Sequence, residues 1–341
     1  MDKHIVVIGG GVAGLEASGR LGRMGFRVTL LEKDENIGGH ITRWYQLFPD
    51  RRNSREVTDY LASISDHKNI TIMTGTEVES LAAEGGQYIV STADAGSLRA
   101  DAVVIATGFD LFDAGRKEEY GYGIYENVIT AAELEAMFQK GRIVTAAGTP
   151  PKRVGIVHCV GSRDEKAGNY HCSKVCCVTA VKQAIEIREM LPETRVFCFY
   201  MDMRMFGPGY EELYRESQEK WNVNYIRGKV SEAGETIDHR LSIKVEDTLA
   251  GRPMKMEIDL LVLMTGMENS ASGSRLARKS GLELGDNRFF RGRDHHFATN
   301  ESDHRGIFFA GSCISPMNIT DSLSHARAAA LEVSDYLENK R

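Results

Sequence analysis

Residues 4–14 read HIVVIGGGVAG, and this stretch decides the fold. The apolar run over 5–8 is typical of a strand buried on both faces of a parallel sheet. The glycines that follow are spaced as Gly9-x-Gly11-x-x-Gly14, which lets the backbone curl tightly and open a helix. The sequence therefore predicts a strand that turns sharply into a helix.

The next residues complete a β-α-β unit. A helical pattern covers 15–24, and a second apolar strand covers 27–31 and ends at Glu32. The free N–H groups at the start of the helix suit a pyrophosphate. A carboxylate at Glu32 can accept a hydrogen bond from a ribose hydroxyl. The unit is thus predicted to bind a dinucleotide, whereas a tight turn without a ligand is the structural alternative.

The same pattern occurs a second time. Residues 101–108 (DAVVIATG) and 259–266 (DLLVLMTG) are similar strands, and each follows a stretch that could form an antiparallel ribbon, over 71–92 and 224–258. The second copy would begin with the strand 153–158. We therefore expect an α/β fold with two Rossmann-like domains, the second inserted into the first.

The predicted layout has four parts. A helix is expected at 131–139, a strand running into a glycine turn at 306–312, and a final helix over about 320–337. The parts are residues 1–112, the first piece of a dinucleotide-binding domain; 113–150, a connector; 151–268, the inserted module; and 269–341, the second piece of the first domain.

Composition excludes several classes of protein. The chain has 341 residues, 42 basic and 48 acidic side chains and a formal net charge of −6, which argues against a nucleic-acid binder. No apolar run is long enough to span a bilayer, and the first residues do not resemble a signal peptide. We expect a cytoplasmic protein, in which the 6 cysteines are metal ligands, redox groups or core residues.

Four cysteines stand where the second domain should carry its own glycine turn. Cys159 follows the strand 153–158, and Cys172, Cys176 and Cys177 complete the spacing C-x12-C-x3-C-C. Adjacent cysteines suit a cubane iron–sulfur cluster, whose ligands bind separate irons. A zinc ion, reactive thiols and inert core residues remain open at this stage.

The first domain resembles the FAD domain of two-dinucleotide-binding flavoproteins. The resemblance lies in the early glycine pair after Glu32, the Ala-Thr-Gly strand end and the last glycine turn, after which the final helix points its start at the flavin; Thr320 is the expected cap of that helix. It implies FAD contacts at Gly9, Gly11, Val12, Ala13, Gly14, Glu32, Lys33, Gly38, Gly39, Val78, Ala106, Thr107, Gly108, Gly311, Ser312, Ile319 and Thr320.

Longer motifs resemble one family. The stretches CVGSRD (159–164), YHCSKVCC (170–177) with Lys182, and DMRMFGPGYE (202–211) look like the HdrA subunit of heterodisulfide reductases and related quinone-interacting flavoproteins. The resemblance implies FAD, a [4Fe-4S] cluster on the four cysteines, and a homodimer. It also implies that Lys182 lies near the reactive edge of the flavin and tunes it; a solvated helix lysine is the alternative.

The chain departs from archaeal HdrA, which carries ferredoxin-like inserts with further C-x-x-C motifs. In this respect it resembles the short HdrA-like subunit of bacterial sulfur-oxidising systems. That likeness implies electron transfer with B- and C-type partner subunits, in sulfur oxidation, with a lipoate-binding protein as a further partner. The rival functions are an NAD(P)H-dependent FAD disulfide oxidoreductase, which predicts a second glycine fingerprint, and a zinc-binding flavoprotein scaffold.

Overall fold

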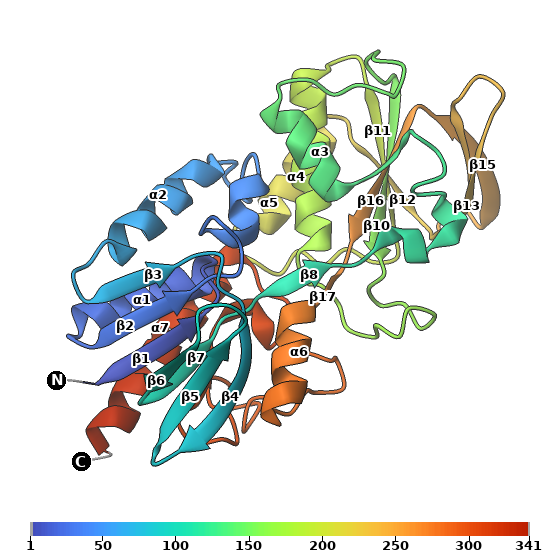
Figure 1. Ribbon diagram of the computed structural model, residues 1–341. Helices are drawn as coiled ribbons and strands as arrows, with labels where there is room; N and C mark the ends of the chain where they lie inside the picture. The colour runs from blue at the N-terminus through green and yellow to red at the C-terminus, as the bar shows by residue number, and fades with distance from the viewer. Residues whose placement is uncertain (1–2, 340–341) are drawn as a thin grey trace. The chain divides into compact units, whose positions relative to one another are not determined.

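The computed structural model describes residues 3–339, which form two compact units (Figure 1). Unit 1 consists of the chain up to residue 42, residues 55–110 and the chain from residue 268 onward. Unit 2 consists of residues 43–54 and 111–267. Each unit has its own parallel sheet, which carries a small antiparallel ribbon and helices.

Unit 1 is built on a five-stranded parallel sheet whose strands lie in the order β18-β7-β1-β2-β3. Its central strand β1 (His4–Ile8) lies between β2 and β7. The other strands are β2 (Arg27–Leu31), β3 (Ile70–Met73), β7 (Ala102–Ile105) and β18 (Ile307–Phe309).

Both faces of this sheet are covered, because alternate side chains of β1 point to opposite faces. Ile5 and Val7 pack in a core with helices α1 (Val12–Arg23) and α7 (Ile319–Asn339). Val6 and Ile8 pack on the other side with the antiparallel ribbon and α6. The elements of that side are β4 (Val78–Glu84), β5 (Gln87–Thr92), β6 (Ser97–Ala100) and α6 (Ala271–Ser280). On the first side, helix α2 (Ser54–Ser65) also contributes residues to the core with α1 and α7.

Unit 2 repeats this plan. Its parallel sheet has the order β12-β11-β10-β16-β9, with β10 (Arg153–Val160) in the centre. Its other elements are β9 (Val128–Thr130), β11 (Arg195–Tyr200), β12 (Asn224–Arg227) and β16 (Leu260–Thr265), the ribbon β13 (Val230–Glu235), β14 (Leu241–Asp247) and β15 (Arg252–Ile258), and the helices α3 (Ala131–Gln139), α4 (Cys176–Met190) and α5 (Tyr210–Glu219).

Short elements complete the chain. The strands β8 (Phe109–Leu111) and β17 (Met267–Asn269) pair with each other. Four 3-10 turns are η1 (Gly39–Arg43), η2 (Ala114–Arg116), η3 (Glu118–Tyr120) and η4 (Gly311–Cys313).

The predicted fold class is confirmed, since one α/β architecture occurs twice. The ribbon predictions are partly wrong: β3 and β12 join the parallel sheets, and only β4–β6 and β13–β15 form antiparallel ribbons. The predicted connector 113–150 groups by its contacts with unit 2, where it supplies β9 and α3, and residues 43–54 group there as well.

No helix within residues 3–339 is both long enough and apolar enough to cross a lipid bilayer.

Candidate functional site

Each sheet offers one natural place for a ligand. In an open parallel sheet, ligands bind beyond the carboxyl ends of the strands at the point where the connections diverge to opposite sides. That point lies after β1 in unit 1, between β2 and β7, and after β10 in unit 2, between β11 and β16. The glycine turn occupies the first place and Cys159 the second.

The glycine turn after β1 is packed so tightly that it excludes side chains. A Cβ atom on Gly14 would collide with the backbone oxygen of Gly9, so the helix can start this close to the strand only with glycine. At Gly11, by contrast, a Cβ would meet nothing within 4 Å, so this position faces open space. The first turn of α1 carries no side-chain cap and no acidic residue, which leaves its N–H groups for an anion.

Glu32 is held rigidly beside this turn. Its side chain is buried, its Oε2 accepts a hydrogen bond from the Gly10 amide at 2.6 Å, and its Oε1 accepts one from the Asp34 amide at 2.9 Å. Each carboxylate oxygen keeps capacity for a further hydrogen bond. The carboxylate is therefore oriented in advance to accept the hydroxyl groups of a ribose.

The early glycine pair, Gly38 and Gly39, lies against the same turn. The Gly38 amide donates to the Gly10 oxygen at 2.7 Å, and Gly38 forms a parallel bridge with Gly11. A Cβ on Gly39 would lie 3.2 Å from the Cα of Gly11. These glycines bring a second backbone segment onto the dinucleotide turn.

The Ala-Thr-Gly segment leaves β7 next to β1. The Ala106 amide donates to the Ile8 oxygen at 2.8 Å, so the two strand ends stay paired up to the turn. Thr107 Oγ1 is buried and has no hydrogen-bond partner within the described residues 3–339. A buried hydroxyl without a partner is costly, and a ligand at the turn could satisfy it. Gly108 follows in the left-handed conformation, at φ +64°.

The last glycine turn also reaches the start of α1. A Cβ on Gly311 would lie 2.5 Å from the Cβ of Ala13, so only glycine fits there. The Gly311 amide donates to Nδ1 of His325 at 3.0 Å, which ties the turn to helix α7. Ser312 is buried in the same turn.

The cap of α7 differs from the prediction. The sequence predicts Thr320 as the cap, but the helix begins at Ile319, and Asn318 caps it by accepting the Asp321 amide at 2.7 Å. Ile319 and Thr320 are therefore the first two residues of the helix, and Thr320 is exposed. An asparagine is among the strongest capping residues, whereas threonine is weaker.

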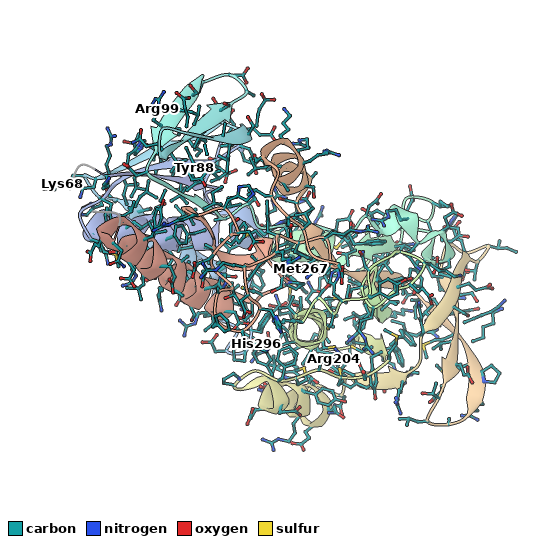
Figure 2. The ribbon with its side chains drawn as sticks, turned by 90° about the horizontal axis from the view of Figure 1, so that it is seen from below. Lys68, Tyr88, Arg99, Arg204, Met267 and His296 are labelled. Carbon is teal, nitrogen blue, oxygen red and sulfur yellow. The ribbon has the colours of Figure 1, made fainter. Side chains whose placement is uncertain are left out.

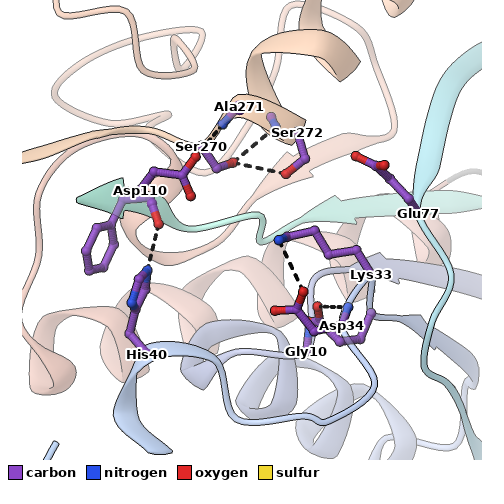
Figure 3. A network of polar contacts seen from close by, with 12 residues as sticks. Gly10, Lys33, Asp34, His40, Glu77, Asp110, Ser270, Ala271 and Ser272 are labelled. Carbon is purple, nitrogen blue, oxygen red and sulfur yellow. Dashed lines mark hydrogen bonds and ion pairs between the residues drawn. The ribbon is translucent and has the colours of Figure 1, made fainter. Parts of the chain in front are cut away.

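Two predicted contacts lie apart from the glycine turn itself. Val78 is buried at the start of β4 and packs in the core. Lys33 is exposed, and its Nζ pairs with Asp34 Oδ1 at 3.3 Å (Figure 3). Lys33 and Asp34 line an open cavity of about 420 Å³ whose far wall includes Ala271 and Ser272 at the start of α6. The residues that line this cavity all belong to unit 1.

Polar contacts hold residues at this cavity and next to it in the chain. Asp110 Oδ2 accepts the Ala271 amide at 2.8 Å, and Ser270 caps α6 by accepting the Gly273 amide at 3.0 Å (Figure 3). His40 Nε2 contacts the Phe109 oxygen at 2.9 Å, and its ring stacks on that of Phe109. Sequence reasoning did not identify these groups, because they lie outside every motif.

In unit 2 the four predicted cysteines come together. Cys159 ends the central strand, Cys176 and Cys177 begin helix α4, and the sulfur atoms of Cys159 and Cys176 are 3.8 Å apart. Cys172 and Cys177 both interact with the Cys176 thiol. Three of the side chains are buried, while Cys172 is half-buried and faces solvent on one side. All six cysteines of the chain are unpaired by disulfides.

The surroundings favour thiolates. Hydrogen bonding with Cys176 lowers the pKa of both Cys172 and Cys177, whereas hydrogen bonding with Cys159 raises the pKa of Cys176. Arg204 (Figure 2) adds to the lowering at Cys172. The thiolate is the form of cysteine that binds metals. Cys172 and Cys177 are therefore the members of the group that lose their protons most readily.

Buried polar contacts fix the loop that carries Cys172. Asp164 forms a bridge with Asn169, and Asn169 Nδ2 donates to the Gly161 oxygen at 2.9 Å. Lys117 Nζ lies 2.7 Å from Asp164 Oδ2, and only 4% of either side chain is exposed. Arg163 pairs with Asp202 at the rim. The loop is therefore anchored by a buried ion pair and by hydrogen bonds within it.

Among residues 3–339, no group of three or more histidine, cysteine or acidic side chains is arranged to hold a single metal ion. The two remaining cysteines are core residues by position. Burial raises the pKa of Cys198 and raises that of Cys313 to about 12, and both side chains are fully buried. Cys313 donates its S–H to the Ile105 oxygen at 3.2 Å.

Lys182 is not a solvated helix lysine. Its side chain is 3% exposed, and its Nζ lies 2.7 Å from Glu135 Oε1, 3.2 Å from Glu186 Oε2 and 2.8 Å from the Gln46 oxygen. Burial raises the pKa of Glu186 to about 8. One ammonium thus lies between two buried carboxyl groups in unit 2.

Sequence reasoning missed two histidines beside these sites, the buried His158 and the half-buried His325. His158 precedes Cys159 in β10, and His325 holds Gly311 from helix α7. A histidine in an apolar strand, beside a cysteine, was a signal for the first. Nothing in the sequence distinguishes the second, since its partner lies fourteen residues away along the chain.

The chain is similar to known oxidoreductases. Residues 1–134 match the family model described as pyridine nucleotide-disulphide oxidoreductase. Among solved structures, the thioredoxin reductase of T. acidophilum has a TM-score of 0.69 at 20% identity, with 100% of both chains covered. That of Lactococcus lactis has a TM-score of 0.66 at 16% identity, covering 99% of this chain and 100% of the other. These structures share the fold.

Two curated proteins have a higher sequence identity to this chain than these structures have. The A-type iron-sulfur subunit of the CoB–CoM heterodisulfide reductase of Methanocaldococcus jannaschii is 32% identical over 98% of this chain and 64% of its own length. The A-type subunit of the H2/formate:CoB-CoM heterodisulfide,ferredoxin reductase of Methanococcus maripaludis is 30% identical with the same coverage. The chain thus spans just under two thirds of these relatives. The first alignment covers 423 positions, 82 more than the chain has residues, so the relative carries insertions within the matched region.

Proposed function

Because the chain is homologous to the A-type subunits of heterodisulfide reductases over 98% of its length, we propose that it is an electron-transfer subunit containing FAD and a [4Fe-4S] cluster. The predicted resemblance to these subunits and the oxidoreductase class are confirmed by the relatives and the family match. The observation that carries the proposal is the gathering of four cysteines at the place in unit 2 where unit 1 has its glycine turn.

The fit to FAD rests on unit 1. The open N–H groups of α1 would receive the pyrophosphate, and Glu32 would accept the ribose hydroxyls. The unpartnered Thr107 hydroxyl and the Gly311 turn border the same region. When bound, a flavin supplies exchange of two electrons and their division into single steps.

The fit to a cluster rests on unit 2. Cys159, Cys172, Cys176 and Cys177 supply four sulfurs from one strand end, one loop and one helix start. Adjacent cysteines can bind different corners of a cubane, whereas a single tetrahedral ion requires all its ligands to converge on one point. When bound, such a cluster supplies one-electron transfer. The ion pair of Lys117 with Asp164 would keep the loop in place for it.

The further roles follow from the resemblance. We place the chain in a heterodisulfide reductase-like complex with B- and C-type subunits, as a homodimer in the cytoplasm, with sulfur-compound oxidation and a lipoate-binding protein as its context. The insertions that the archaeal relative carries and this chain lacks support the short type of subunit. Lys182 is proposed to tune the flavin; its Nζ lies within 3.2 Å of the buried carboxyl groups of Glu135 and Glu186.

The test is anaerobic purification followed by assays of flavin, iron, acid-labile sulfide and zinc. We expect one FAD and about four irons per chain. Cys176→Ser and Cys177→Ser should each lose the iron and the broad visible absorption while keeping the flavin. The matched control is Cys198→Ala, because this cysteine is buried in the same unit but lies in the strand β11.

Three results would overturn the proposal. Zinc without sulfide in the purified protein would support the zinc scaffold. Unchanged iron in both Cys176→Ser and Cys177→Ser would remove the four cysteines as ligands. Direct reduction of the flavin by NADH in the isolated chain would favour the disulfide oxidoreductase.

A further inference from the structure

Two buried carboxyl groups share one buried ammonium in unit 2. Lys182 and Glu186 lie one turn apart on α4, and Glu135 lies on α3. No more than 3% of any of these three side chains is exposed. A buried charge without a balancing charge is very costly. Because one ammonium balances only one carboxylate, the other carboxyl group is expected to carry a proton.

The hydrogen bonds show which carboxyl group is ionised. Oε1 of Glu135 accepts from Lys182 Nζ at 2.7 Å and from Gln183 Nε2 at 2.7 Å. Its Oε2 accepts from the Tyr45 amide at 2.8 Å. Donors to both oxygens of a carboxyl group favour the charged form. Glu135 is therefore the carboxylate that balances Lys182.

Glu186 has the opposite surroundings. Neither of its oxygens accepts a hydrogen bond within residues 3–339, and Lys182 Nζ lies 3.2 Å from Oε2 as an ion-pair contact. The side-chain oxygens of Gln183 and Gln46 are also buried without a donor in this part of the chain. Buried acceptors normally have donors, and a protonated carboxyl group supplies one. A proton on Glu186 would thus provide the donor that these oxygens lack.

The charges that act on Glu186 agree with this assignment. Burial has the largest effect and raises its pKa. The Lys182 ammonium lowers the pKa, whereas the negative charges of Glu135 and Glu189 raise it. The result is a pKa of about 8.

The other charged groups packed near α4 pair with one another. Glu189 of α4 pairs with Arg51 of the segment 43–54, and Arg51 Nη2 lies 3.6 Å from Glu216 Oε1 of α5. These side chains are partly exposed, so water screens their charges. The strands β10, β11 and β16 meet α4 in the largely apolar core of unit 2.

We propose that Lys182, Glu135 and Glu186 form a buried proton-binding site, in which Glu186 carries a proton at neutral pH and releases it to solvent in mild alkali while the chain stays folded. With this proton bound, the three side chains have no net charge; its release leaves one negative charge in the interior. A buried acid that exchanges a proton near neutral pH is suited to proton transfer. The inference goes beyond the proposed function and depends on neither cofactor.

The experiment is infrared difference spectroscopy of the anaerobically purified full-length protein across neutral and mildly alkaline pH. A protonated carboxyl group has a carbonyl band that carboxylates lack and that shifts in D2O. We expect the wild type to show this band at neutral pH and to lose half of it at about pH 8. Glu186→Gln should lack the band. The matched control is Glu189→Gln, an exposed position on the same helix, which should keep it.

A second variant tests the sharing of one ammonium by two carboxyl groups. Glu135→Gln removes the carboxylate that balances Lys182, so Glu186 should ionise in its place. The band should therefore disappear at neutral pH, although Glu186 itself is unchanged. A band of wild-type strength in Glu135→Gln would overturn the proposal. So would a wild type without the band at neutral pH, or a band that Glu186→Gln retains.

Urea unfolding provides a readout that does not depend on spectra. The folded state binds the Glu186 proton more tightly than the unfolded chain does, whose glutamates have their usual pKa of 4.5. The free energy of unfolding of the wild type should therefore fall, relative to that of Glu186→Gln, as the pH rises from about 4.5 to 8. Parallel curves for the two proteins would overturn the proposal. Flavin and iron contents enter neither measurement, so the site is tested independently of the proposed function.

Discussion

At the scale of single residues, backbone amide groups hold polar side chains in place beside the proposed flavin site. Glu32 is fixed by two amide groups, and His325 by the amide of Gly311. His158 lacks any such partner among residues 3–339. The sequence predicted Glu32 because its place after the second strand is regular. It could not predict the role of His325, since the hydrogen bond from the Gly311 amide joins helix α7 to a turn fourteen residues earlier in the chain.

The first prediction concerns flavin binding. Glu32→Gln should weaken the affinity for FAD by about 10- to 100-fold, because a charged acceptor is lost and a buried amide would be left facing N–H donors. Equilibrium titration of the flavin-free protein with FAD measures this change. Glu35→Gln, at an exposed position nearby, is the control. An affinity equal to that of the wild type would exclude Glu32 from the site.

The second prediction concerns acid stability. Burial lowers the pKa of His325 to about 4, and its Nδ1 accepts from Gly311 and lies 3.2 Å from Asn300 Nδ2, so a second ring proton would face N–H donors. The unfolded chain, with a pKa near 6.5, therefore binds this proton more tightly. Stability should fall as the pH drops from about 6.5 to 4, by up to about 3 kcal/mol.

Urea unfolding of the wild type and His325→Gln across this pH range tests the effect. The wild type should lose more stability than the variant between pH 6.5 and 4, because glutamine does not take up the proton. His304→Gln, at an exposed position, is the control. Parallel curves for wild type and His325→Gln would show that His325 does not titrate in this window.

At the scale of elements, the segment before the inserted sheet supports the cysteine loop. Lys117, next to η3, reaches Asp164 in that loop, and it holds the pKa of Asp164 below its usual range although burial alone raises it. The sequence predicted this segment to be a connector. Charged residues in a glycine-rich stretch resemble a solvated loop, and only the folded structure shows that one of them is buried.

Lys117→Met should destabilise unit 2 by about 3 kcal/mol, because it leaves a buried carboxylate without its closest partner. Unfolding in urea, followed by circular dichroism, measures the change. Lys279→Met is the matched control, since its ion pair with Glu79 is exposed and should contribute less than about 1 kcal/mol. Equal stability of the two variants would mean that the buried pair does not support the loop.

Some elements were predictable from sequence and others were not. The helix α3 begins with a capping box in which Thr130 and Glu133 exchange hydrogen bonds, and the predicted range agrees with the observed one. The helices α5 and α6 were missed, since both are short and mostly polar. Their stability comes from tertiary packing, which local sequence does not encode.

At the scale of the whole molecule, one architecture occurs twice, with a glycine turn after the central strand of unit 1 and Cys159 at the end of the central strand of unit 2. The sequence predicted this repeat because buried parallel strands are nearly all apolar and end in recognisable turns. It did not predict that residues 43–54 group with unit 2. The grouping of residues 43–54 with unit 2 depends on contacts with residues far away in the chain, and this segment has no periodic hydrophobic pattern that would predict them.

The final prediction follows from the separation of the two sites between units. Glu32→Gln should reduce flavin content and leave iron unchanged, and Cys177→Ser should do the reverse. The double variant should show the sum of both effects, because changes without shared partners are additive. Flavin and iron assays on the four proteins measure this. Loss of iron in Glu32→Gln would show that the sites assemble together.

The pairing of β10 with β16 shifts register between Val157 and Val160, and this bulge at the end of β10 has a consequence for protein engineering. The rest of unit 2, from its apolar parallel strands to the helices that cover them, has the same plan as the sheet of unit 1. The four cysteines proposed to bind the cluster all lie in the short stretch of chain from Cys159 to Cys177. A designer could therefore transplant that stretch onto a stable host of the same topology, and exchange an organic ligand for an inorganic one without redesigning the hydrophobic layers.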